Sequence, residues 1–146
     1  MSADEITTII KEIYEHNAFM KHCGIEIISL TCGEATVGLT IDANKHTNIN
    51  NKPHGGLIMT LMDNATGLAA ATVGKRVVTM STTVNFVKSA NVGDYIEATA
   101  YVESMDENNL IYLRMEVRNK SNNQLMATAI SSMLSIANFG TIPEKW

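Results

Sequence analysis

One apolar stretch limits the folds open to this chain more than any other part of the sequence. From Leu57 to Val73 it is rich in small residues, carries a single charged side chain, Asp63, and follows a pair of glycines. Its apolar residues recur at helical spacing, which predicts a helix from about Gly55 to Val73 that Gly74 ends. Because such a helix is slim, we expect a curved sheet to wrap closely around it.

The rest of the chain is typical of strands with one further helix. Short runs that alternate apolar and polar residues predict strands with one buried face, and the asparagine-rich run from Asp42 to Pro53 predicts a loop. The expected helix spans Asp4–Phe19, and the expected strands span Gly24–Leu30, Glu34–Ile41, Val77–Val87, Tyr95–Glu103, Leu110–Arg118 and Gln124–Ala137.

The order of these elements predicts an α+β fold with a largely antiparallel sheet. The last four strands follow one another as expected hairpins, and neighbouring strands joined by hairpins are antiparallel. In the strand Val77–Val87, alternation groups Val78, Met80, Val84 and Phe86 on one face and Thr79, Ser81, Thr83 and Asn85 on the other. The 146 residues suit one domain over residues 1–146, with a short N-terminal helix.

Composition argues against several classes of partner. The net charge is -4 and the basic residues are scattered, so we expect no nucleic acid partner. The acidic N-terminus lacks the features of a signal peptide, and the longest apolar run is interrupted by Asp63 and Gly67, so we expect no membrane partner. Two cysteines do not make a disulfide framework, and a cytoplasmic protein is expected.

The lone acid of the apolar helix is open to two interpretations. Asp63 either lies on a solvated helix face or faces a pocket or a partner chain, since a charge is not tolerated in an apolar core. Its neighbours at helical spacing include Met59, Thr66 and Ala70, which do not resemble a charged surface. This favours the functional interpretation.

The start of the same helix offers a place for a negative charge. Gly55 and Gly56 expose backbone N–H groups at the positive end of the helix dipole, where an anion or a developing oxyanion is stabilised. His54 and Asn48 can add a hydrogen bond to such a group. For His54 alone, a role in capping the helix or in packing is the main alternative.

The spacing of these two features predicts a dimer. Gly55 and Asp63 are eight residues apart, which is about 12 Å along a helix at about 1.5 Å per residue. Reacting groups must approach to about 3–3.5 Å, so both can act on one substrate only if they come from different chains. Two antiparallel helices across a two-fold axis would give two composite sites.

At this point the chain resembles a known family. The order of elements is similar to the hotdog fold, and the string Asn48-x5-His54-Gly55-Gly56-x6-Asp63 resembles the signature of the PaaI-type acyl-CoA thioesterases of phenylacetate pathways. The resemblance extends from about Phe19 to Ala137. It implies hydrolysis of an acyl-CoA or acyl-carrier-protein thioester to a free acid and a thiol, by dimers or dimers of dimers.

The resemblance also implies roles for individual residues. Asp63 would activate water or attack the thioester, the Gly55 amide would polarise the carbonyl, Asn48 and His54 would help to hold it, and Thr79 would place the water. We expect the substrate-binding residues to be Gly56, Met59, Met62, Lys88 and Ser89. Lys88, Lys75 and Arg76 either meet the phosphates of coenzyme A or are solvated loop cations.

The loop before His54 departs from the family pattern in one residue. Asn51 stands where many members have glycine, and asparagine also adopts a positive φ.

Other catalytic motifs are missing from the sequence. It has no Gly-x-Ser-x-Gly elbow, no metal-ligand spacing and no phosphate-binding loop. We therefore expect neither a metal nor a cofactor, since coenzyme A would be part of the substrate. Two other functions of the same fold stay open: a non-catalytic acyl-CoA binding or sensing module, and a dehydratase or hydratase.

Overall fold

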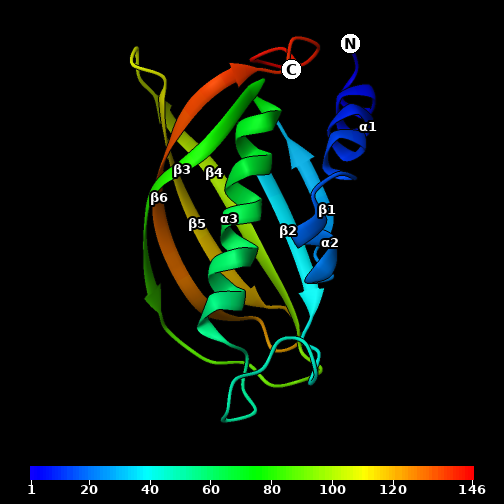
Figure 1. Ribbon diagram of the computed structural model, residues 1–146, viewed down its shortest axis with the longest axis vertical. Coiled ribbons are helices and arrows are strands. Elements are labelled where there is room, and N and C mark those ends of the chain that lie inside the picture. The colour runs from blue at the N-terminus through cyan, green and yellow to red at the C-terminus, as the bar shows by residue number, and fades with distance from the viewer.

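The molecule is built around one long helix, and a curved sheet wraps it (Figure 1). The computed structural model describes residues 1–146. The central helix α3 spans Gly55–Thr72. The strands are β1 (Glu26–Thr31), β2 (Glu34–Thr40), β3 (Lys75–Phe86), β4 (Tyr95–Met105), β5 (Leu110–Asn119) and β6 (Gln124–Asn138). They form one six-stranded sheet in the order β1-β2-β4-β5-β6-β3, and every neighbouring pair is antiparallel. The α+β prediction, with a central helix and an antiparallel sheet, is confirmed.

The pairing of β3 differs from the predicted run of hairpins. β3 pairs with β6 at the edge of the sheet, whereas β4 pairs with β2 and β5. The connection between β3 and β4 first bonds to β6 through the Val87 and Lys88 amides and later bonds to Ile41 beside β2. The connection therefore crosses from one side of the sheet to the other. Among the last four strands, the β4–β5 and β5–β6 hairpins are as predicted and a β3–β4 hairpin is not formed, whereas β1 and β2 pair as an antiparallel hairpin.

A β-bulge also corrects the predicted faces of β3. The register against β6 slips between Thr79 and Ser81 and leaves Met80 without a partner. Before the slip, Thr79 lies on the face that meets α3, and Val78 points outward with 43% of its surface exposed. After the slip, Val84 packs on the core. Val78 and Met80 thus do not share the buried face of Val84, because one extra residue inverts the alternation.

The N-terminal region contains two helices where one was expected over Asp4–Phe19. α1 spans Ala3–Tyr14 and begins with a capping box between Ser2 and Glu5. α2 spans Ala18–His22 and is capped by Asn17, whose Oδ1 accepts from the Met20 amide. Asn17 also donates to Asn64 Oδ1 on α3 at 3.2 Å. This tertiary contact and the cap explain why the helix breaks before α2.

The core lies between α3 and the concave face of the sheet. The alternation predicted for β4 and β5 is confirmed, because their alternate apolar residues are buried. In β2 the apolar residues are buried as predicted, but Thr36 and Gly38 between them are buried as well, so this strand is covered on both faces. α3 is buried on most sides; its exposed residues are Met59 and Asp63, beside the half-buried Thr60 and Gly67. Burial of each large apolar side chain contributes roughly 1.5–3 kcal/mol. None of the helices combines the length and the apolar character that crossing a membrane requires.

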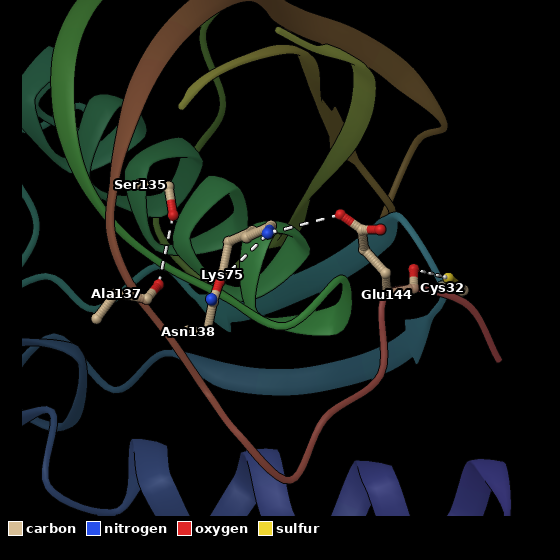
Figure 2. A network of polar contacts seen from close by, with 6 residues as sticks. All are labelled: Cys32, Lys75, Ser135, Ala137, Asn138 and Glu144. Atoms are coloured by element: carbon tan, nitrogen blue, oxygen red, sulfur yellow. Dashed lines mark hydrogen bonds and ion pairs between the residues drawn. The ribbon is translucent and has the colours of Figure 1, made fainter. Parts of the chain in front are cut away.

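The C-terminal tail after β6 folds back over the end of α3 (Figure 1). Trp146 Nε1 donates to the Thr72 carbonyl at 2.5 Å, and Cys32 Sγ donates to the Glu144 carbonyl at 3.3 Å. Lys75 at the start of β3 bonds to Asn138 at the end of β6 and forms an ion pair with Glu144 in the tail, as Figure 2 shows. These contacts fix the tail beside the first residues of β3.

Candidate active site

Asp63 lies on the one uncovered stripe of α3, and its carboxylate is held from one side. Thr79 Oγ1, on β3, donates to Asp63 Oδ1 at 2.7 Å. Asp63 Oδ2 accepts no hydrogen bond and makes no ion pair within the chain. The predicted residues Asp63 and Thr79 are therefore in direct contact, and the second carboxylate oxygen is free to take a proton or to attack an electrophile.

A cavity of about 340 Å³ opens beside this carboxylate. It is formed by α3, β3 and the N-terminal region, with Asp63 and Thr79 on one side and Tyr14, Asn17 and Arg76 on the others. Burial, and next the negative charge of Asp63, raise the pKa of Tyr14 to about 12, and Arg76 opposes the shift. The Tyr14 hydroxyl thus stays protonated next to the acid.

The start of α3 forms a second polar centre. His54 is the N-cap residue, and its Nδ1 accepts from the Gly56 amide at 2.8 Å. A neutral His54 ring then carries its proton on Nε2, which leaves one donor directed away from the cap. The capping alternative for His54 is confirmed by this bond.

The amide of Gly55 is the free donor at this end of the helix. It forms no hydrogen bond within the chain, whereas the Gly56 amide is occupied by His54. A Cβ at Gly56 would lie 2.9 Å from His54 Nδ1, so glycine is required for the cap. Of the two glycine amides predicted to face an oxyanion, the Gly55 amide is therefore the one free to bind it, because the Gly56 amide is engaged in the helix cap.

The loop before the helix is shaped by its own asparagines. Asn48 Oδ1 accepts from the Asn50 and Lys52 amides, so this side chain organises the turn. Asn51 has a φ of 56°, the positive value expected where the family has glycine. Buried His46 fixes the loop to the domain, because it bonds to the Asp42 amide and the Cys23 carbonyl. These hydrogen bonds order the loop and thereby fix the positions of His54 and Gly55 at the start of α3.

A second cavity, of about 290 Å³, lies at the Gly55 end of α3. It is lined by Gly55, Phe86, Lys88 and Ser89 among others. The structure therefore brings Lys88 and Ser89 together with Gly55, and Asp63 together with Thr79, but the two cavities share no lining residue.

The two methionines predicted to bind substrate differ in their surroundings. Met59 is 46% exposed on the uncovered stripe of α3. Met62 is fully buried in the core and lines neither cavity. This placement leaves Met62 to core packing, because the sheet covers its side of the helix.

The sequence interpretation missed the contribution of the N-terminal region to the Asp63 cavity. Tyr14 and Asn17 lie within the helix expected over Asp4–Phe19, and Asn64 lies within the helix expected over Gly55–Val73, so the sequence predicts no role in the site for any of them. The available signal in the sequence was Asn17, a polar residue inside the predicted helix.

No group of three or more His, Cys, Asp or Glu side chains lies close enough together to hold a metal ion.

The sequence is similar to known thioesterases. Residues 51–126 match the model of the Thioesterase superfamily. The acyl-coenzyme A thioesterase PaaI of Escherichia coli K12 is 33% identical over 100 residues, which cover 68% of this chain and 71% of that protein. The matched region contains both His54-Gly55-Gly56 and Asp63.

Solved structures agree with this similarity. The E. coli PaaI protein from the phenylacetic acid degradation operon superposes with a TM-score of 0.85 at 26% identity, covering 93% of this chain and 96% of that one. A Streptococcus mutans protein solved with acetyl-CoA has a TM-score of 0.72 at 25% identity, covering 78% of this chain and 90% of that one. The helix wrapped by an antiparallel sheet is the hotdog fold that the element order predicted.

Proposed function

Because the chain belongs to the thioesterase superfamily, we propose that it is an acyl-CoA thioesterase that cleaves a thioester to a free acid and a thiol. The observation that carries the proposal is the Asp63 carboxylate, the single charge of α3, which Thr79 fixes at the edge of a cavity. The PaaI relative, named as an acyl-coenzyme A thioesterase, and the S. mutans protein solved with acetyl-CoA support the choice of coenzyme A thioesters.

In the proposed reaction Asp63 Oδ2 supplies the attack on the thioester carbonyl. As a general base it takes a proton from water while the water oxygen bonds to the carbonyl carbon; the carbon–sulfur bond then breaks, and the thiolate takes a proton to leave as a thiol. As a nucleophile Oδ2 would itself bond to that carbon, the carbon–sulfur bond would break, and the thiolate would take a proton and leave as a thiol. Water would then hydrolyse the resulting anhydride to the free acid and restore the Asp63 carboxylate. Both routes use the oxygen that Thr79 leaves free.

The helix start would stabilise the negative charge that forms on the carbonyl oxygen. The free Gly55 amide points from the positive end of α3, and the His54 ring has a donor at Nε2. Removal of one such preorganised donor lowers kcat by a factor of about 10²–10³. Lys88 and Ser89, beside Gly55, are suited to bind the coenzyme A end of the substrate.

The two half-sites would become one active site in a homodimer. Within one chain they are separated by about 12 Å of helix at about 1.5 Å per residue. β3 is an edge strand of 12 residues with one unpaired side, and the adjacent stripe of α3 at Met59 and Asp63 is uncovered. Pairing of these edges about a two-fold axis would bring Asp63 of one chain to Gly55 of the other.

The test is thiol release from a panel of acyl-CoAs, followed with a thiol-trapping reagent. We expect hydrolysis by the native chain and a loss of about 10²–10⁴ in kcat for Asp63→Asn. Asparagine keeps the shape and can still accept from Thr79, so the variant should fold normally, and exposed Asp4→Asn is the matched control. Full activity of Asp63→Asn would refute the assignment, and tight acyl-CoA binding without thiol release would favour a binding module.

A further inference from the structure

A cation without a partner stands at the edge of the Asp63 cavity. Arg76 lines this cavity, yet its guanidinium makes no ion pair and no hydrogen bond with the protein. Its guanidinium carbon lies 5.9 Å from the centre of the Phe139 ring. The ring gives the cation a preferred position and leaves its donors free.

The C-terminal tail fixes this arrangement and separates Arg76 from its basic neighbour. Phe139 is held because its amide donates to the Gly74 carbonyl at 2.8 Å. Lys75 is already engaged by Asn138 at 3.2 Å and Glu144 at 3.5 Å, as Figure 2 shows. Of these two adjacent cations, only Arg76 is available to a ligand.

A second free donor lies in the same cavity. The Tyr14 hydroxyl forms no hydrogen bond with the protein and lies over Gly67, one helical turn beyond Asp63. A Cβ at Gly67 would come within 3.0 Å of this hydroxyl oxygen, so the glycine leaves the space that it occupies. Since the pKa of Tyr14 is raised to about 12, the hydroxyl is a donor at all physiological pH values.

Resting on the proposed function, we propose that Arg76 and Tyr14 bind a carboxylate at the far end of the acyl group, so that thioesters of dicarboxylic acids are preferred. A carboxylate accepts charge-assisted hydrogen bonds, which a guanidinium and a phenol hydroxyl supply and which no protein group takes up here. Repulsion from Asp63 would disfavour a carboxylate close to the thioester, so the acyl chain needs several carbons. Glutaryl and pentanoyl groups are a matched pair for comparison.

The experiment uses N-acetylcysteamine thioesters, which lack the phosphates of coenzyme A. For the native chain we expect kcat/KM to be about tenfold higher with the glutaryl than with the pentanoyl thioester, as one charge-assisted contact allows at a partly exposed site. Arg76→Met should bring the ratio close to one, Tyr14→Phe should lower it about threefold, and Arg76→Lys should restore part of it. Lys120→Met, which removes an exposed cation outside this cavity, should leave the ratio unchanged.

The outcomes separate this inference from the proposed function. Equal hydrolysis of the two thioesters by the native chain overturns the carboxylate site and leaves the thioesterase standing. A loss in Arg76→Met that appears only with coenzyme A thioesters, equally for both acyl groups, assigns Arg76 to a phosphate and also overturns it. If neither thioester is hydrolysed, the affinities of two stable thioethers of coenzyme A test the carboxylate site. The native chain must bind the 4-carboxybutyl thioether more tightly than the pentyl thioether, and Arg76→Met must lose this difference; equal affinities for the native chain overturn the site.

Discussion

The bond between Thr79 and Asp63 is the most specific single contact of the candidate site. Thr79→Val removes the hydroxyl and keeps the shape, so one oxygen of the carboxylate loses its fixed position. A hydrogen bond to a charged group contributes about 1.5–3 kcal/mol, and we expect kcat to fall about 10- to 100-fold with little change in KM. Steady-state kinetics on the best acyl-CoA give the comparison.

A matched variant separates the hydroxyl from the packing of this residue. Thr79→Ser keeps the donor and loses only a methyl group, so it should retain most of the activity. If Thr79→Val were as active as Thr79→Ser, the hydroxyl would have no part in positioning Asp63.

Tyr14 gives the protein a dependence on alkaline pH that one substitution removes. Its folded pKa of about 12 lies above the ordinary tyrosine value of 10.0, so the unfolded chain loses this proton first as the pH rises. The stabilisation is complete below pH 10 and is lost as the pH rises from 10 to 12, and the loss amounts to about 2 kcal/mol by pH 11.5. Urea unfolding at pH 9 and pH 11.5 measures it.

The comparison with Tyr14→Phe isolates this effect from the other tyrosines. Tyr95, Tyr101 and Tyr112 also have raised pKa values, but they remain in both proteins. The difference in unfolding free energy between native chain and variant should therefore change by about 2 kcal/mol between the two pH values. A constant difference would show that Tyr14 ionises normally and is not buried near Asp63.

At the scale of elements, Asn17 joins the N-terminal region to the central helix. It caps α2 and donates to Asn64, the neighbour of Asp63. Asn17→Ala removes both contacts and should destabilise the protein by about 1–3 kcal/mol, as loss of a helix cap and a hydrogen bond predicts. Thermal or urea unfolding measures the loss.

Asn17→Asp tests which of the two contacts matters. Aspartate keeps the cap oxygen but has no side-chain N–H for Asn64, so it should recover about 1 kcal/mol of the loss. Because Asn17 also lines the Asp63 cavity, both variants should alter acyl selectivity. Unchanged stability in Asn17→Ala would show that the break between α1 and α2 does not depend on these bonds.

The elements that the sequence predicted well are those whose burial is simple. Apolar residues occupy every second position of β2, β4 and β5, and α3 is apolar on nearly every side. These patterns are therefore enough to predict the central helix and the three strands. The faces of β3 were harder to predict because apolar residues lie on both of them, and because no residue type in the sequence marks the bulge at Met80. The break at Asn17 depends on Asn64, which is 47 residues away along the chain.

The same reason limits what could be predicted of the site. Asp63 and Gly55 could be predicted as candidates from a local anomaly and a motif, and Thr79 from the resemblance to the family. Tyr14 and Arg76 belong to different elements that meet only when α1 packs beside α3 and the tail fixes Phe139. Contacts of this kind depend on the tertiary arrangement, and no spacing in the sequence marks them.

At the scale of the whole molecule, the decisive question is whether the active site is shared between chains. Two inactive variants test it. Asp63→Asn removes the attacking carboxylate, and Gly55→Pro removes the free amide while placing proline at the first helical position, where its missing N–H and fixed φ are tolerated. His54, with φ of -63° and ψ of 138°, already has the extended conformation required before proline.

A mixture of the two variants should regain activity only if the sites are composite. A heterodimer then contains one site with both Asp63 and Gly55 intact and one site with both altered. With equal amounts and random pairing, half of the dimers are mixed and half of their sites are intact, so activity should recover to about a quarter of the native value. The variants are unfolded together, refolded and assayed, with each variant alone as the control. If each site lay within one chain, every site in the mixture would still be defective and the activity would stay at the level of the separate variants.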